Sequence, residues 1–162
     1  MDEVDRILAA WSAEAPELDV TPMAVLSRVS RLARHLDLAR RDTFAAHGLE
    51  VWEFDVLAAL SREGVPYELS PGELIHQTLS TSGTMTNRID RLVDRGLVER
   101  LPHPSDRRGV RVRLRPEGRD LAASALRDLL ALEERVLAGL DAARRDDMAD
   151  TLRQLLARFE EA

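Results

Sequence analysis

The chain has 162 residues, a formal net charge of −6 at neutral pH and no cysteine. Its length favours one domain, and the missing cysteines exclude disulfides and zinc–thiolate sites, as is typical of a reducing cytoplasm. No signal peptide or long apolar run is present, so we expect a cytoplasmic protein with no membrane partner. Aromatic residues make up only 4% of the chain, and packing must rely on Leu, Ala and Val, which favours helices.

Three helices are predicted in the N-terminal part of the chain, over residues 2–15, 22–46 and 50–62. Thr21 is the expected N-cap of the second helix, with Pro22 in its first turn. The third helix is apolar on nearly every side, so we expect it to be buried.

A helix-turn-helix is predicted to follow. Residues 70–73 read Ser-Pro-Gly-Glu, a capping box that opens a short helix over 71–77. After a turn at 78–80, a longer helix begins near Ser80, Thr81 or Ser82 and ends at Gly96. Its apolar residues recur at helical spacing and form one packing face, while polar and basic residues occupy another.

Two strands, over residues 97–101 and 110–115, enclose a charged loop at 102–109. Two more helices are predicted over 116–137 and 141–160, with Asp141 as a cap. The expected fold class is mainly α with a small β-hairpin wing: a winged helix-turn-helix at 50–115 and a helical dimerisation lobe formed by 1–46 and 116–162. The long helices carry more apolar surface than a small winged-helix core can cover, which favours a homodimer.

Positive charge gathers on this central segment. Residues 80–119 contain ten Arg and five acidic residues, against the net charge of −6 for the whole chain. Solvated surface arginines are the plain alternative, but a helix, a turn and an arginine-tipped ribbon in this order favour double-stranded DNA as a partner. The candidate contacts to the major groove or phosphates are Ser82, Thr84, Thr86, Asn87, Arg88 and Arg91. Arg107 and Arg108 are expected at the wing, one of them in the minor groove.

These motifs resemble the MarR family of dimeric bacterial transcription regulators along essentially the whole chain. The resemblance rests on Asp106-Arg107-Arg108 with the strand and helix start that follow, and on the run from Arg91 to Arg100. It implies a homodimer that binds a palindromic operator.

A narrower resemblance, to the urate-responsive, PecS-like branch, rests on the first helix with its Trp, on residues 54–57 and on residues 82–88. It implies that Trp11, Asp55, Arg88 and Arg100 bind a small anion such as urate or xanthine, which weakens DNA binding. From the residues alone, a carboxylate such as Asp55 in an apolar run needs an arginine partner. The sequence leaves the role of Arg88 open between a contact to DNA, a contact to the ligand and a salt bridge to Asp55.

Two alternative functions are open from the sequence. A MarR-type regulator that senses a phenolic acid or another small aromatic anion would differ only in its pocket. A helical interaction protein without DNA binding would leave the wing arginines unexplained. We expect no enzyme, cofactor or metal, because the four histidines are dispersed and no phosphate-binding or nucleophile motif is present.

Overall fold

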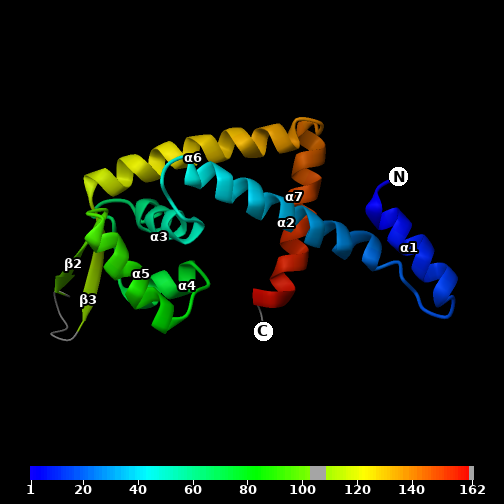
Figure 1. Ribbon diagram of the computed structural model, residues 1–162, viewed down its shortest axis with the longest axis horizontal. Coiled ribbons are helices and arrows are strands. Elements are labelled where there is room, and N and C mark those ends of the chain that lie inside the picture. The colour runs from blue at the N-terminus through cyan, green and yellow to red at the C-terminus, as the bar shows by residue number, and fades with distance from the viewer. Residues whose placement is uncertain (103–108, 161–162) are drawn as a thin grey trace. The chain divides into compact units, whose positions relative to one another are not determined.

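The computed structural model describes residues 1–102 and 109–160, and the chain divides into two compact units, Met1–Trp52 and Glu53–Ala162 (Figure 1). Within these residues the fold is mainly helical, with a small antiparallel sheet, and the predicted fold class is confirmed.

The first unit contains α1 (Glu3–Glu14) and α2 (Met23–Ala45), which pack against each other (Figure 1). A capping box opens α1: Asp2 Oδ1 accepts from the N–H of Asp5 at 3.0 Å, and Asp5 Oδ2 accepts from the N–H of Asp2 at 2.8 Å. The predicted N-cap of α2 is wrong. Pro22 takes that position, because the hydroxyl and N–H of Thr21 both donate to Asp19 Oδ1.

The chain then forms α3 and a helix-turn-helix. Their bounds are α3 (Val51–Arg62), α4 (Pro71–Gln77) and α5 (Ser82–Asp94). Two long helices complete the second unit, α6 (Pro116–Leu137) and α7 (Ala142–Glu160). The predicted cap at Asp141 is confirmed, since its Oδ1 accepts from the N–H of Arg144 at 2.9 Å.

The sheet has the strand order β1-β3-β2, with β1 (Glu68–Leu69), β2 (Val98–Pro102) and β3 (Val110–Leu114) all antiparallel to their neighbours. The predicted hairpin is confirmed, and Val98 faces Leu114 in its register. The sequence did not predict β1, because two residues are too short to display an alternating pattern.

The core of the second unit gathers around one face of α5, where Met85, Ile89 and Leu92 are almost wholly buried. These residues follow i, i+4, i+7 spacing and so lie on a single face. The helix ends as Gly96 predicts. Gly96 adopts a φ of +68°, its N–H donates to Val93 O at 2.8 Å, and the N–H of Leu97 donates to Leu92 O at 3.0 Å. This pair of bonds is a Schellman motif, which fixes where α5 turns into β2.

Gly118, in the first turn of α6, lies against the backbone of Leu97, where α5 turns into β2. A Cβ at Gly118 would stand 2.3 Å from Leu97 O and 2.9 Å from Leu114 Cδ1. The same carbonyl accepts from the N–H of Arg115 at 3.0 Å, so it is held in place. The close approach of α6 to the base of the wing therefore requires glycine.

We expect Gly118→Ala to lower the free energy of unfolding by about 1–3 kcal/mol, because the added methyl group must displace a hydrogen-bonded backbone carbonyl. Urea denaturation followed by circular dichroism at fixed protein concentration measures this. Gly72→Ala is the matched control, because its Cβ would meet nothing closer than Ser70 Oγ at 3.9 Å. Equal stability of the two variants would contradict the packing argument.

Candidate nucleic-acid interface

The helix-turn-helix is built by local hydrogen bonds. Ser70 and Glu73 form the predicted capping box: Ser70 Oγ accepts from the N–H of Glu73 at 3.2 Å, and Glu73 Oε2 accepts from the N–H of Ser70 at 2.6 Å. These bonds start α4, and Leu79 in the turn that follows adopts a φ of +49°. Thr81 is the N-cap of α5, and its hydroxyl lies 2.9 Å from Thr84 Oγ1.

The side of α5 away from the core presents most of the predicted DNA contacts. Ser82, Thr84, Thr86, Asn87 and Arg91 are all exposed. Hydroxyl, amide and guanidinium groups of this kind contact base edges and phosphates when a helix enters the major groove. The structure thus brings five of the six predicted helix residues to the surface of one helix.

Arg88, the sixth, is different, because it is only half-exposed and its Nη1 donates to Ser80 Oγ at 2.7 Å. Its guanidinium therefore ties the body of α5 to the residues that precede it. This contact adds an internal role to those that the sequence left open for Arg88.

Arg100 is also engaged within the protein. Its Nη1 lies 2.6 Å from Asp90 Oδ1, and its Nη2 donates to the backbone oxygen of Thr86 at 3.5 Å. Arg100 therefore braces α5 from β2. The ion pair is partly exposed on both sides, so an anion from solvent can reach it.

The strand arginines at the base of the wing are neutralised by carboxylates. Arg111 Nη1 lies 2.9 Å from Glu73 Oε2, and Arg113 Nε donates to Glu68 Oε1 at 2.6 Å. The N–H of Ser70, with the Ser70 hydroxyl and Arg111 adding to it, holds the pKa of Glu73 below its usual value. These arginines therefore stabilise the sheet. The predicted wing contacts, Arg107 and Arg108, lie outside the described residues.

The buried carboxylate on α3 is Glu53 rather than Asp55. Glu53 is 2% exposed, whereas Asp55, which the sequence places in the same apolar run, is half-buried. The helical period accounts for this, because Glu53 shares its face with Val56, Leu57 and Leu60 at i+3, i+4 and i+7. Glu53 Oε2 lies 2.7 Å from Arg95 Nη1. The helical spacing that buries Glu53 was visible in the sequence, but its pairing with Arg95 was not predicted.

Trp11, the predicted aromatic ligand contact, lies on α1 and is 47% exposed. Arg28 of α2 holds the start of this helix: its Nε donates to Asp2 Oδ2 at 2.8 Å, and its Nη2 donates to Asp5 Oδ1 at 2.6 Å. Hydrogen bonds from Arg28 and then from the N–H of Asp5 lower the pKa of Asp2. Those from the N–H of Asp2 and then from Arg28 lower the pKa of Asp5.

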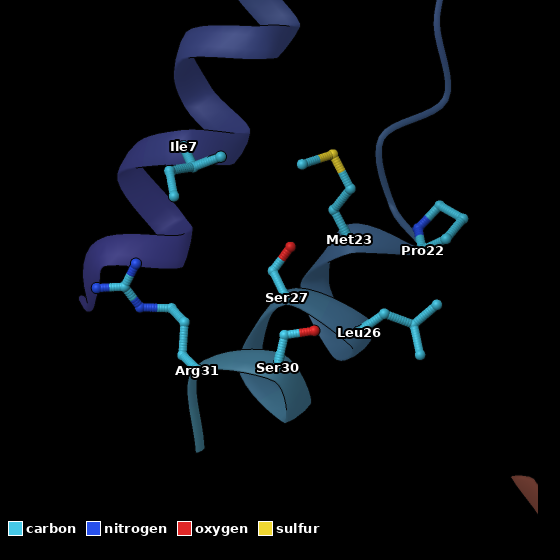
Figure 2. A pocket seen from close by; sticks show the side chains of 7 residues that line it. All are labelled: Ile7, Pro22, Met23, Leu26, Ser27, Ser30 and Arg31. Atoms are coloured by element: carbon cyan, nitrogen blue, oxygen red, sulfur yellow. The ribbon is translucent and has the colours of Figure 1, made fainter. Parts of the chain in front are cut away.

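An open groove of about 430 Å³ lies between α1 and α2 (Figure 2). Ile7 of α1 faces Met23 of α2 across it, and Ser27, Ser30 and Arg31 line its polar side. Trp11 does not line this groove.

Within residues 1–102 and 109–160, no group of three His, Cys, Asp or Glu side chains could hold a metal ion. No helix in this part of the chain is long and apolar enough to cross a membrane.

Comparison with known proteins identifies the family of this chain. The chain is 35% identical over 158 residues to the HTH-type transcriptional regulator PecS of Dickeya dadantii (strain 3937), across 98% of this chain and 93% of that protein. The chain belongs to the MarR family. Residues 47–109, which include the helix-turn-helix and the first strand of the hairpin, β2, match that family directly. The relatives are transcriptional regulators, and this chain is a MarR-family transcriptional regulator.

Two solved structures are also similar to this chain. A mutant MarR from E. coli, complexed with operator DNA, superposes with a TM-score of 0.72 at 25% identity over 85% of this chain and 95% of that one. BpsR of Bordetella bronchiseptica, whose DNA binding is regulated by 6-hydroxynicotinic acid, superposes with a TM-score of 0.63 at 27% identity over 79% and 98%.

We expect Arg28→Gln to release α1 from α2, because the neutral amide cannot replace the ion pairs to Asp2 and Asp5. Hydrogen exchange at pH 7, resolved by mass spectrometry, should then show faster exchange in residues 3–14. Arg34→Gln, an exposed change on the same helix, is the control. Unchanged exchange in the Arg28 variant would contradict this role.

The same contact should depend on acid. The pKa values of Asp2 and Asp5 are lowered in the folded chain from the ordinary value of 3.8. Their contribution is therefore complete above about pH 4 and is lost as the pH falls through the lowered values.

Proposed function

We propose that this MarR-family regulator binds a palindromic operator as a homodimer, and that a small anionic ligand such as urate or a related purine releases it. The observation that carries the proposal is α5, which buries one face in the core and exposes Thr84, Asn87 and Arg91 on another. We assign DNA contacts to the exposed face and to Arg107 and Arg108 of the wing. E. coli MarR, which is similar to this chain, has been solved in complex with operator DNA, and this supports operator DNA as the partner.

The homodimer is supported by apolar side chains that the described residues leave uncovered. Leu26, Val29 and Leu32 of α2 are exposed, and so are Leu152 and Leu156 of α7. Their helical spacing forms stripes, and stripes of this kind are commonly covered by a second subunit. We infer that a second copy covers them. A two-fold dimer would present two α5 helices to successive major grooves of a palindrome.

The ligand proposal rests on Trp11, Asp55, Arg88 and Arg100. Trp11 offers an exposed ring for stacking, and Arg100 offers a cation that an anion can reach. Because Arg88 and Arg100 both brace α5, an anion that draws on either guanidinium would change how α5 is held. The ligand must favour the form that does not bind DNA by about 1–3 kcal/mol to act as a useful switch.

A second candidate ligand is a small aromatic acid. BpsR, which is similar to this chain, is regulated by 6-hydroxynicotinic acid. The exposed ring of Trp11 and the exposed guanidinium of Arg100 would suit a planar carboxylate as well as a purine.

Fluorescence anisotropy of a labelled duplex from directly upstream of the gene tests the proposal. We expect tight binding that weakens steeply as salt rises, because phosphate contacts release counterions, and that urate reverses. Reversal by 6-hydroxynicotinic acid but not by urate would select the second ligand class. If this duplex is not bound, the regulator does not act directly upstream of its own gene. If the protein then enriches no duplex from a random library, the proposal that it binds specific DNA is wrong.

The role of Trp11 is tested by Trp11→Ala. We expect the urate concentration for half-release of the DNA to rise about tenfold, because stacking of a base on an aromatic ring contributes about 1–3 kcal/mol. The measurement is the same anisotropy titration, normalised to the affinity of each protein for DNA without urate. Ser12→Ala, the exposed neighbour, is the control. An unchanged half-release concentration would exclude Trp11 from the site.

A further inference from the structure

Glu53 is an unusual residue in this fold. It is 2% exposed, and within the described part of the chain no other charged side chain is as deeply buried. Burying a carboxylate costs free energy that its ion pair often fails to recover, and an apolar residue of similar volume would commonly be as stable or more stable. The retained charge therefore suggests a role in fixing an arrangement.

Its partner lies at a defined point of the helix-turn-helix. Arg95 is the C-cap of α5, and its Nη1 stands 2.7 Å from Glu53 Oε2. Gly96 and Leu97 follow at once with the Schellman bonds that turn the chain into β2. Glu53 thus holds α5 at the junction between the helix and the wing.

Other contacts of α5 act along its apolar face, at its start and at its middle. Met85, Ile89 and Leu92 bury an apolar face, but apolar contacts are not directional and allow a helix to slide or rotate. The Arg88–Ser80 hydrogen bond acts at the start of α5, and the Asp90–Arg100 pair acts at its middle. The Glu53–Arg95 pair adds a directional contact at the C-terminal end.

We propose that Glu53 is a positioning residue for operator recognition: through Arg95 it sets the orientation of α5, and so the alignment of the exposed residues of α5 with base edges. This rests on the proposed function. Glu53 is buried, so it acts without touching DNA. Its negative charge also repels DNA at long range. Removing the charge should therefore weaken binding if positioning of α5 dominates, and strengthen it if repulsion dominates.

The test compares two duplexes for each protein. One is the duplex that the wild-type protein selects from a random library, and the other is its scrambled sequence. For Glu53→Gln we expect affinity for the selected duplex to fall about tenfold, comparable to one mismatched base pair. Affinity for the scrambled duplex should stay equal or rise slightly, because a negative charge has been removed.

The control is Glu63→Gln, which makes the same charge change at an exposed position just after α3. It should leave the ratio of the two affinities at the wild-type value. Arg95→Lys, which keeps a cation beside Glu53, should retain most of the preference for the selected duplex. If Glu53→Gln does not fold by circular dichroism, Arg95→Gln tests the contact from its half-exposed partner and should lower the ratio similarly.

The outcomes distinguish a failure of the positioning role from a failure of the proposed function. A loss of affinity that is equal on both duplexes would mean that Glu53 only maintains the folded fraction, and would overturn the proposal. An unchanged ratio in the folded Glu53 and Arg95 variants would also overturn it. A wild-type protein that selects no duplex would overturn the proposed function, and the positioning role with it.

Discussion

The burial of one face of α5 is the constraint on which the rest of the second unit depends. Met85, Ile89 and Leu92 place that face in the core, and the helical period then leaves the opposite face in solvent. The backbone that follows is equally constrained, because Gly118 brings α6 against the carbonyl of Leu97. An exposed recognition surface is thus a consequence of how the core is packed.

The positive charge available on this surface is smaller than the sequence indicates. Residues 80–119 carry ten Arg and five acidic residues, but Glu53, Glu68 and Glu73 lie outside that stretch and neutralise arginines within it. Opposite charges in contact largely cancel at a distance. The arginines that act on a phosphate backbone are therefore fewer than the count. A charge counted along the chain is not the charge of a surface.

Much of the fold could be predicted because its signals are local. The capping box at Ser70, the end of α5 at Gly96 and the alternation in β3 each lie within a few residues, and each was confirmed. The contacts that were missed are long-range, whereas the cap that failed, at Thr21, is local, because Thr21 donates to Asp19 instead. Neither β1, paired with β3, nor the Glu53–Arg95 pair follows from neighbouring residues, because only the folded chain brings the partners together. The face of α3 that carries Glu53 was readable, but its partner was not. The ligand set from Trp11 to Arg100 and the two-lobe division remain predictions.

The contacts of α5 also bear on how such a regulator could respond to a ligand. Polar contacts of Arg88, Arg95 and Arg100 hold the helix at different points along its length. Two of these contacts are partly exposed, and at the third the carboxylate is buried. Polar contacts near solvent exchange partners at little cost, because water or an anion can replace what is lost, whereas a buried carboxylate has no such replacement. The end of α5 held by Glu53 is therefore the fixed end. Any change that a ligand makes through Arg88 or Arg100 would turn the helix about that point, and would displace its N-terminal residues most. These are the residues with which a recognition helix reads the major groove.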